Sequence, residues 1–315
     1  MRTLAKVLAA LTLAVLAYIA LGGVMAASAG PLPLRGQMVD IGGRRMHIIC
    51  EGPKGAGPTI LFEAGAFGFS ADWGAVQQKV TAQGLHSCSY DRAGMGLSDP
   101  GPQPRDGIAV ASDLEKLLTA VHEDGPFILV GHSMAGPRIQ LFANRNPDKI
   151  AGLVYVDAAT PEVTDTPSGQ AFVKTFTRAS KLASFGASIG LYAPLAGTWL
   201  GDKYGLPPAA SAEKRRAFAD PRHNRTAAQE VEQWQALSDQ AKASGPLNPA
   251  WPVAVLTAGH RGGGANSLRD APATNSRAGY AENVPEATHQ TLVGLAYSDA
   301  VIRGIDHVRA ALAKP

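Results

Sequence analysis

Phe127-Ile-Leu-Val-Gly-His-Ser-Met-Ala-Gly136 leads from an apolar run through a glycine into a segment with helical character. The run Phe127–Val130 predicts a short buried strand, and a helix is expected to follow. A sharp turn between them presents the side chain of Ser133 above the edge of a sheet. The backbone N–H of Met134 then lies at the positive end of the helix, where it can stabilise an oxyanion. The pattern predicts a nucleophilic serine.

Small residues, Gly131 and Ala135, stand two positions before and after Ser133. This G-x-S-x-A turn resembles the nucleophile elbow of the α/β-hydrolase fold, with Ala where the family more often has Gly. A second run, Asp91-Arg-Ala-Gly-Met-Gly-Leu-Ser98, also resembles the family. We expect Asp91 and Arg92 to hold that loop by local ion pairing and to take no part in chemistry.

Apolar runs that predict strands alternate with stretches of helical spacing along most of the chain. Together with the resemblance, which covers nearly all of residues 37–313, this alternation predicts an α/β-hydrolase fold. We expect a mostly parallel eight-stranded sheet with helices on both faces. The expected strands are Gln37–Ile41, Arg44–Cys50, Thr59–Phe62, His86–Tyr90, Phe127–Val130, Ile150–Val156, Trp251–Thr257 and Ala281–Pro285.

Residues 160–250 interrupt the alternation and are too many for a plain connection. They contain helix-prone pieces at Phe172–Phe185, Ser211–Ala219 and Thr226–Ala243. At this place α/β-hydrolases usually carry a helical cap, so we interpret residues 160–250 as a cap. Residues 30–159 and 251–315 then form the core.

The resemblance implies a catalytic triad in the chain order nucleophile, acid, histidine. His289 fits this order, because it follows the last predicted strand and precedes the closing helix, which apolar residues at helical spacing predict over Leu292–Ala313. Two carboxylates remain candidates for the acid. Asp157 directly follows the strand after the elbow helix, a place that some family members use, and we predict Asp157 to be the acid. Asp270 lies after the next strand, where most members place the acid, but thirteen residues beyond that strand.

The family takes a second oxyanion donor from a glycine-containing loop after an early strand, here Glu63-Ala-Gly-Ala-Phe-Gly68. The resemblance assigns this backbone N–H to Ala66, with Phe67 as the neighbouring candidate. The first donor is Met134. Read without the resemblance, the same loop is a plain glycine turn.

Cys50 and Cys88 are the two cysteines of the chain. In the strand order of the family they fall on neighbouring strands, which implies a disulfide, while two buried free thiols are the alternative. The bridge would close a loop of about 38 residues. Two cysteines and scattered histidines show no metal-ligand spacing, so we expect no metal and no cofactor.

The N-terminus resembles an export segment. Arg2 and Lys6 precede an uncharged apolar stretch, residues 7–27, and Ala27-Ser-Ala29 offers a small-x-small cleavage site. The stretch is also close to the ~20 residues that span a bilayer. A cleaved signal peptide and a retained membrane anchor therefore both stay open for residues 1–29, with a periplasmic, secreted or anchored protein as the consequence.

The 315 residues carry a net charge of +3 and no dense Lys/Arg block, which gives nucleic-acid binding no support. We therefore expect an exported serine hydrolase that cleaves a small-molecule ester through an acyl-enzyme on Ser133. Amide, lactone or peroxide chemistry on the same fold is a rival, and a non-catalytic binding protein is another. Acyl-chain length and oligomeric state cannot be read from the sequence.

Overall fold

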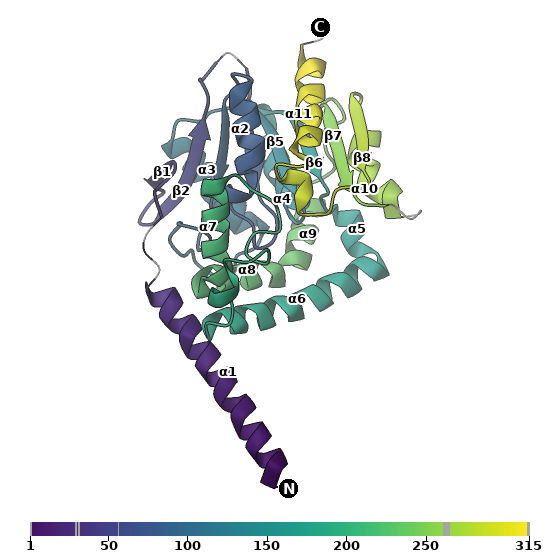
Figure 1. The fold of residues 1–315 in the computed structure, drawn as a ribbon. Coiled ribbons are helices and arrows are strands. Elements are labelled where there is room, and N and C mark those ends of the chain that lie inside the picture. The colour runs from purple at the N-terminus through teal and green to yellow at the C-terminus, as the bar shows by residue number, and fades with distance from the viewer. Residues whose placement is uncertain (1, 29, 31, 56, 261–264, 314–315) are drawn as a thin grey trace.

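The computed structural model describes all residues except 1, 29, 31, 56, 261–264 and 314–315. In the described part of the chain, the strands form an eight-stranded sheet with the order β1-β2-β4-β3-β5-β6-β7-β8 (Figure 1). β2 pairs with β1 and β4 in antiparallel fashion, and the other neighbours are parallel. The strands are β1 Gln37–Asp40, β2 Arg45–Glu51, β3 Thr59–Glu63, β4 Ser87–Tyr90, β5 Phe127–His132, β6 Ile150–Val156, β7 Val253–Ala258 and β8 Gly279–Val284.

Apolar side chains alternate between the two faces of the central strands, as the pleat requires. Leu61 and Leu129 join one buried cluster, while Ile60 and Ile128 join the other. Helices cover both clusters, so the central strands are buried on both faces. α2 (Gly74–Ala82) and α11 (Ser298–Leu312) pack on one face, and α3 (Gly107–Ala120) and α4 (Ala135–Arg145) pack on the other.

The chain between β6 and β7 forms the helical cap. Its helices lie together at one end of the sheet (Figure 1). α6 and α8 pack side by side within it. The cap helices are α5 Pro161–Asp165, α6 Pro167–Ser188, α7 Pro208–Ala219, α8 Pro221–Glu232 and α9 Trp234–Ala243. Three of them begin with a proline after a side-chain cap, from Thr160, Thr166 and Asp220. Proline at this position suits a helix start, because its missing N–H would have no helical partner.

Three details differ from the sequence-based expectation. The helix expected at Thr226–Ala243 is divided at Gln233 into α8 and α9. The closing helix was expected from Leu292, but a short 3₁₀ turn precedes α11, and Gly294 between them is extended. A Cβ at Gly294 would lie 1.7 Å from the carbonyl oxygen of Tyr204, so the close approach of the cap requires glycine there. The sequence also failed to predict α10 (Ala265–Thr274).

The N-terminal helix α1 (Arg2–Ser28) projects away from the rest of the chain (Figure 1). It is long and apolar enough to cross a membrane, a test that a signal sequence near an N-terminus also passes. Of the small-x-small site expected at residues 27–29, Ala29 lies outside the described residues.

Candidate active site

Ser133 occupies the turn between β5 and α4 and has a left-handed backbone with φ 60°. Such a conformation is strained for a residue with a side chain and recurs at functional sites. Hydrogen bonds fix the turn, since Ser133 N donates to Val156 O (3.2 Å) and Ala159 N donates to Ser133 O (2.9 Å). Gly136 leaves room for this contact, because a Cβ there would lie 1.9 Å from the carbonyl oxygen of Ala159.

Asp157 and His289 meet although 132 residues separate them in the sequence. Asp157 follows β6 directly, and His289 lies in the loop between β8 and α11. The Oδ2 atom of Asp157 is 2.6 Å from Nδ1 of His289. Its Oδ1 atom accepts hydrogen bonds from Arg269 (3.3 Å) and from the backbone N–H of Ala258 (3.4 Å).

The surroundings of Asp157 favour its charged form. Burial opposes ionisation of the carboxyl group, but the hydrogen bond and the charge of His289, together with Arg269, outweigh it and lower the pKa of Asp157. A carboxylate in this place orients the imidazole and stabilises an imidazolium. The other candidate acid, Asp270, lies on α10, where its carbonyl accepts a hydrogen bond from Thr274 (3.2 Å).

A cavity of about 360 Å³ brings the candidate residues together, because Ser133, Asp157 and His289 all line it. The cap supplies most of its apolar wall. The cap residues in the wall are Val163, Thr164, Gly169, Phe172, Val173 and Trp234. A small molecule with an apolar part therefore fits beside the serine.

Two backbone N–H groups at this site, those of Met134 and Ala66, donate no hydrogen bond within the described part of the chain. Met134 directly precedes α4, where the first helical N–H groups have no helical partner. Ala66 follows Gly65, whose missing side chain lets the loop approach Ser133: a Cβ at Gly65 would lie 2.7 Å from Cβ of Ser133. Phe67 follows with φ 56°, and its carbonyl accepts a hydrogen bond from Lys214 (3.1 Å).

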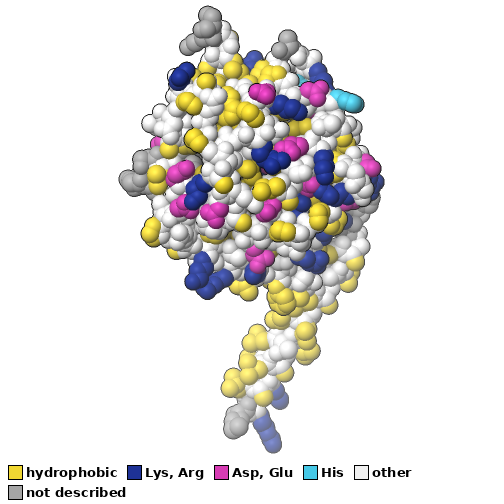
Figure 2. Space-filling model, turned by 180° about the vertical axis from the view of Figure 1, so that it is seen from behind, with side chains coloured by type: hydrophobic (Ala, Val, Ile, Leu, Met, Phe, Trp, Pro, Cys, Tyr) yellow, Lys and Arg dark blue, Asp and Glu magenta, His cyan; other side chains and the backbone are white. Residues whose placement is uncertain are grey.

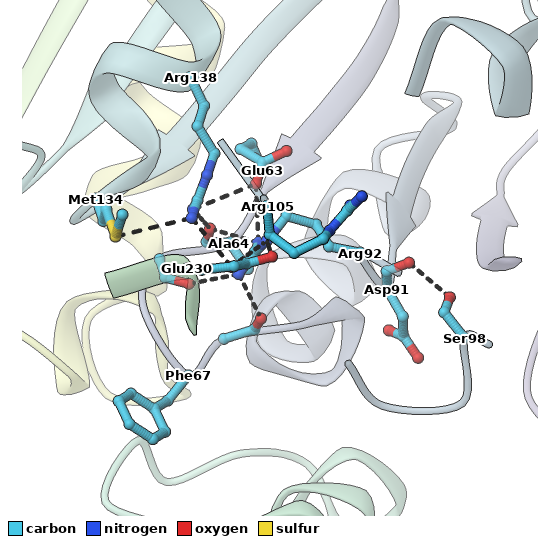
Figure 3. A network of polar contacts seen from close by, with 12 residues as sticks. Glu63, Ala64, Phe67, Asp91, Arg92, Ser98, Arg105, Met134, Arg138 and Glu230 are labelled. Atoms are coloured by element: carbon cyan, nitrogen blue, oxygen red, sulfur yellow. Dashed lines mark hydrogen bonds and ion pairs between the residues drawn. The ribbon is translucent and has the colours of Figure 1, made fainter. Parts of the chain in front are cut away.

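A buried network of charged residues packs against the Glu63–Gly68 loop and binds its carbonyl groups (Figure 3). The guanidinium group of Arg92 donates to the carbonyl oxygens of Ala64 (2.8 Å) and Gly65 (2.9 Å). It also pairs with Glu63 of β3 (2.8 Å) and Glu230 of α8 (2.9 Å). Arg92 therefore connects the cap to the loop that contains Ala66.

The expectation of purely local ion pairing is wrong for Arg92, because its carboxylate partners lie outside its own loop. Asp91 makes one contact within its own loop, a hydrogen bond accepted from Leu97 N (2.8 Å). It also accepts a hydrogen bond from Ser70 N (3.0 Å) and pairs with His47 (2.9 Å), both outside the loop. Both residues make structural contacts. Glu230 and its second partner Arg138 were missed, because no local motif marks them.

His132, which directly precedes Ser133, contacts the loop of His289. Its Nε2–H donates to the carbonyl oxygen of His289 (2.8 Å), and the two ring centres are 4.4 Å apart. Burial, with repulsion by His289, lowers the pKa of His132 to about 3. His132 is therefore neutral near pH 7 and acts as a hydrogen-bond donor that positions the His289 loop.

Cys50 and Cys88 form a disulfide and are direct partners in the β2–β4 ladder. Among the described residues, Cys50, His86, Cys88 and Glu123 form one group of potential metal ligands, with ligand atoms within 4.8 Å of one another. The disulfide occupies both sulfur atoms, and His86 contacts Glu123 (3.0 Å). Glu123 also pairs with Lys54 (2.6 Å), so in this oxidised state the group offers no free ligand set.

The family model of the alpha/beta hydrolase fold matches residues 58–260, so the chain belongs to the α/β-hydrolase fold family. Among solved structures, it resembles a proposed epoxide hydrolase from Pseudomonas aeruginosa (TM-score 0.68, 17% identity, 90% of this chain and 100% of that one). It also resembles a proposed ancestral haloalkane dehalogenase (TM-score 0.65, 15% identity, 88% and 100%). At these identities the likeness concerns the fold alone.

A curated relative, "Probable transporter efuK" of Hormonema carpetanum, is 36% identical over 129 residues. The match covers 39% of this chain and 18% of that protein. The chain spans less than half the length of the first curated relatives that it matches.

Proposed function

We propose that the protein is a serine hydrolase that cleaves carboxylic esters through an acyl-enzyme on Ser133. One observation carries the proposal: the imidazole of His289, held by the Asp157 carboxylate at 2.6 Å, shares a cavity with Ser133. A serine in a strained turn, an imidazole and an orienting carboxylate are the parts that nucleophilic acyl transfer needs.

In the first half-reaction, Oγ of Ser133 attacks the acyl carbon of the ester, and Nε2 of His289 takes the hydroxyl proton. The negative charge develops on the former carbonyl oxygen, where the N–H groups of Met134 and Ala66 donate hydrogen bonds. Collapse of the intermediate breaks the bond to the alkoxide, which leaves with the proton from His289. Asp157 stabilises the imidazolium throughout.

In the second half-reaction, water attacks the acyl-enzyme while His289 again removes a proton. As the tetrahedral intermediate collapses, its bond to Oγ of Ser133 breaks, His289 returns the proton to Oγ, and the carboxylic acid is released. Both oxyanion donors are backbone groups, Met134 at the start of α4 and Ala66 in the loop that Arg92 anchors, so they need little reorganisation as charge develops.

A hydroxyl nucleophile separates this proposal from epoxide hydrolysis and dehalogenation, which need a carboxylate in the elbow. The apolar wall supplied by Phe172, Val173 and Trp234 suits the acyl or alkyl part of an ester.

Hydrolysis of p-nitrophenyl esters of graded acyl length tests this function. The wild-type chain should release nitrophenol, and Ser133→Ala should abolish the release. Ser188→Ala, which changes an exposed serine at the end of α6, should leave the rate unchanged. Hydrolysis that persists in Ser133→Ala would contradict the proposal.

We also infer that the catalytic body works outside the reducing cytoplasm. A disulfide persists in oxidising compartments, and Cys50 and Cys88 form one. The apolar helix α1 at the N-terminus supports export in either role, as a signal sequence or as an anchor.

A further inference from the structure

Large apolar side chains are exposed near the end of α6 and on the loop that follows it, and this loop contacts α1. We define the cap face as Leu182 and Phe185 of α6 together with Trp199 of the following loop. Their exposed fractions are 71% for Leu182, 63% for Phe185 and 70% for Trp199. Single exposed apolar residues are ordinary, but large ones gathered on neighbouring segments indicate an interaction surface.

The N-terminal helix packs against the loop that belongs to this surface. The hydroxyl of Tyr18 donates to the carbonyl oxygen of Leu191 (3.2 Å). Gly22 lies so close to Gly190 that a Cβ at Gly22 would be 1.9 Å from the carbonyl oxygen of Gly190. The cap therefore contacts the helix itself, and α1 leaves the body beside the end of α6 (Figure 1).

The position of this contact along α1 fixes the depth of the cap. From Val7, where the uncharged stretch begins, to Gly22 the helix is about 23 Å long at 1.5 Å per residue. The hydrocarbon core of a bilayer is about 30 Å thick. If α1 spans a bilayer from Val7, the apolar residues beyond Gly22 must also lie within it, so the loop at Gly190 reaches below the membrane surface.

The charge of this part of the cap fits an anionic surface. No Asp or Glu occurs between Asp165 and Asp202, while Lys174, Arg178 and Lys181 lie in that interval. All three basic residues are exposed on α6. Figure 2 shows Lys and Arg side chains around the end of the body from which the helix projects. Basic residues near the surface of a membrane with anionic lipids are attracted to it.

We propose that the cap face rests in the interface of the phospholipid bilayer that α1 spans, with Leu182, Phe185 and Trp199 inserted among the lipids. Trp199 is suited to this place, because an indole combines an apolar ring with a polar N–H. The basic residues of α6 then lie at the depth of the phosphate groups. The helix α1 and the cap face then bind the same membrane as two linked contacts. Because both are engaged at once, the cap keeps a fixed orientation relative to the membrane.

Trp199 provides a direct test, because it is exposed whereas Trp73, Trp234 and Trp251 are buried. The full-length chain is reconstituted into vesicles of phosphatidylcholine and phosphatidylglycerol, with either ordinary or brominated acyl chains. We expect the brominated lipids to quench part of the tryptophan fluorescence of the wild-type chain. The variant Trp199→Phe should lack this quenched component.

A second variant tests the other residues of the cap face and leaves the fluorescent Trp199 in place. With Leu182→Asp and Phe185→Asp, both at exposed positions, quenching of Trp199 should decrease while the circular dichroism spectrum stays unchanged. Equal quenching of the wild-type chain and Trp199→Phe would overturn the proposal. The proposal would also be overturned if the fluorescence of Trp199 changed with protein concentration and not with bromination of the lipids. Such a result would assign the cap face to contact with a second copy of the chain.

Discussion

The carboxylate of Asp157 lies 2.6 Å from Nδ1 of His289 and, by its other oxygen, 3.3 Å from a guanidinium nitrogen of Arg269. If this carboxylate orients the imidazole, Asp157→Asn should lower kcat by about 10⁴-fold, since an amide does not stabilise the required tautomer or the imidazolium. Ester hydrolysis under substrate saturation measures this effect.

Asp270→Asn is the matched control, because Asp270 was the other carboxylate that the sequence offered. It should change kcat by less than about tenfold, which is about 1.4 kcal/mol in the activation free energy. A large loss in Asp270→Asn with little loss in Asp157→Asn would reverse the assignment of the acid.

Gly65 should be needed for the position of the nucleophile. In Gly65→Ala the new Cβ would lie 2.7 Å from Cβ of Ser133 and 3.0 Å from the carbonyl oxygen of His132, so the elbow or the loop must shift. A displacement of about 1 Å can cost about 10²-fold in rate, and we expect a loss of this size in kcat.

Gly57→Ala is the control for that substitution, since a Cβ at Gly57 meets no atom within 4 Å. Steady-state kinetics of both variants with one p-nitrophenyl ester make the comparison. Equal kcat values for the two variants would show that the close approach of the loop at Gly65 has no role in catalysis.

Glu230 should stabilise the fold through its charge. Burial opposes its ionisation, but Arg92 and Arg138 outweigh burial and lower the pKa of Glu230 below its ordinary 4.5. Breaking a buried pair by removing one partner costs about 3–5 kcal/mol, so Glu230→Gln should be less stable than the wild type by about that amount near pH 7.

The pH dependence of that difference has a defined sign. A carboxyl group with a lowered folded-state pKa contributes stability above its unfolded pKa and loses it as the pH falls through the folded value. The difference between wild type and Glu230→Gln should therefore shrink below pH 4.5. Urea unfolding at several pH values measures it. Glu232→Gln, on the same helix but in an exposed pair with Lys181, should cost no more than about 1 kcal/mol.

The disulfide should stabilise the body, because it ties two strands together across a sequence separation of 38 residues. Replacing Cys50 and Cys88 by serine should lower the free energy of unfolding by about 2–4 kcal/mol. Urea unfolding in detergent, with and without dithiothreitol, provides the measurement. The reductant should destabilise the wild type and leave the double variant unchanged, and equal stability of both proteins without reductant would contradict the expectation.

The sequence predicted those parts of the fold that local pattern determines. β6 was predicted with its observed ends, Ile150 and Val156, because a continuous apolar run is bounded by a helix end and by Asp157. The elbow could be recognised because Ser133 and its small neighbours, Gly131 and Ala135, lie within five residues of sequence. α10 was missed, since Pro272 lies inside it and proline lacks the N–H that a helix interior uses.

The parts that depend on distant contacts could not be predicted. The prediction of Asp157 rather than Asp270 depended on the resemblance to some family members, because residue type does not separate the two and the contact with the imidazole exists only in the folded chain. The ion pair between Arg92 and Glu230 joins residues 138 positions apart, and neither stands in a motif that indicates the other. The hydrogen bond from His132 to the carbonyl of His289 is equally invisible in the sequence.

Covalent labelling with a fluorophosphonate tests the central claim most directly, because an activated serine displaces fluoride and retains the phosphonate. Mass spectrometry of the labelled and digested protein locates the adduct. We predict one adduct on Ser133 in the wild type, little adduct in His289→Ala and none in Ser133→Ala. An unlabelled wild-type protein, or an adduct that forms equally in Ser133→Ala, would contradict the account.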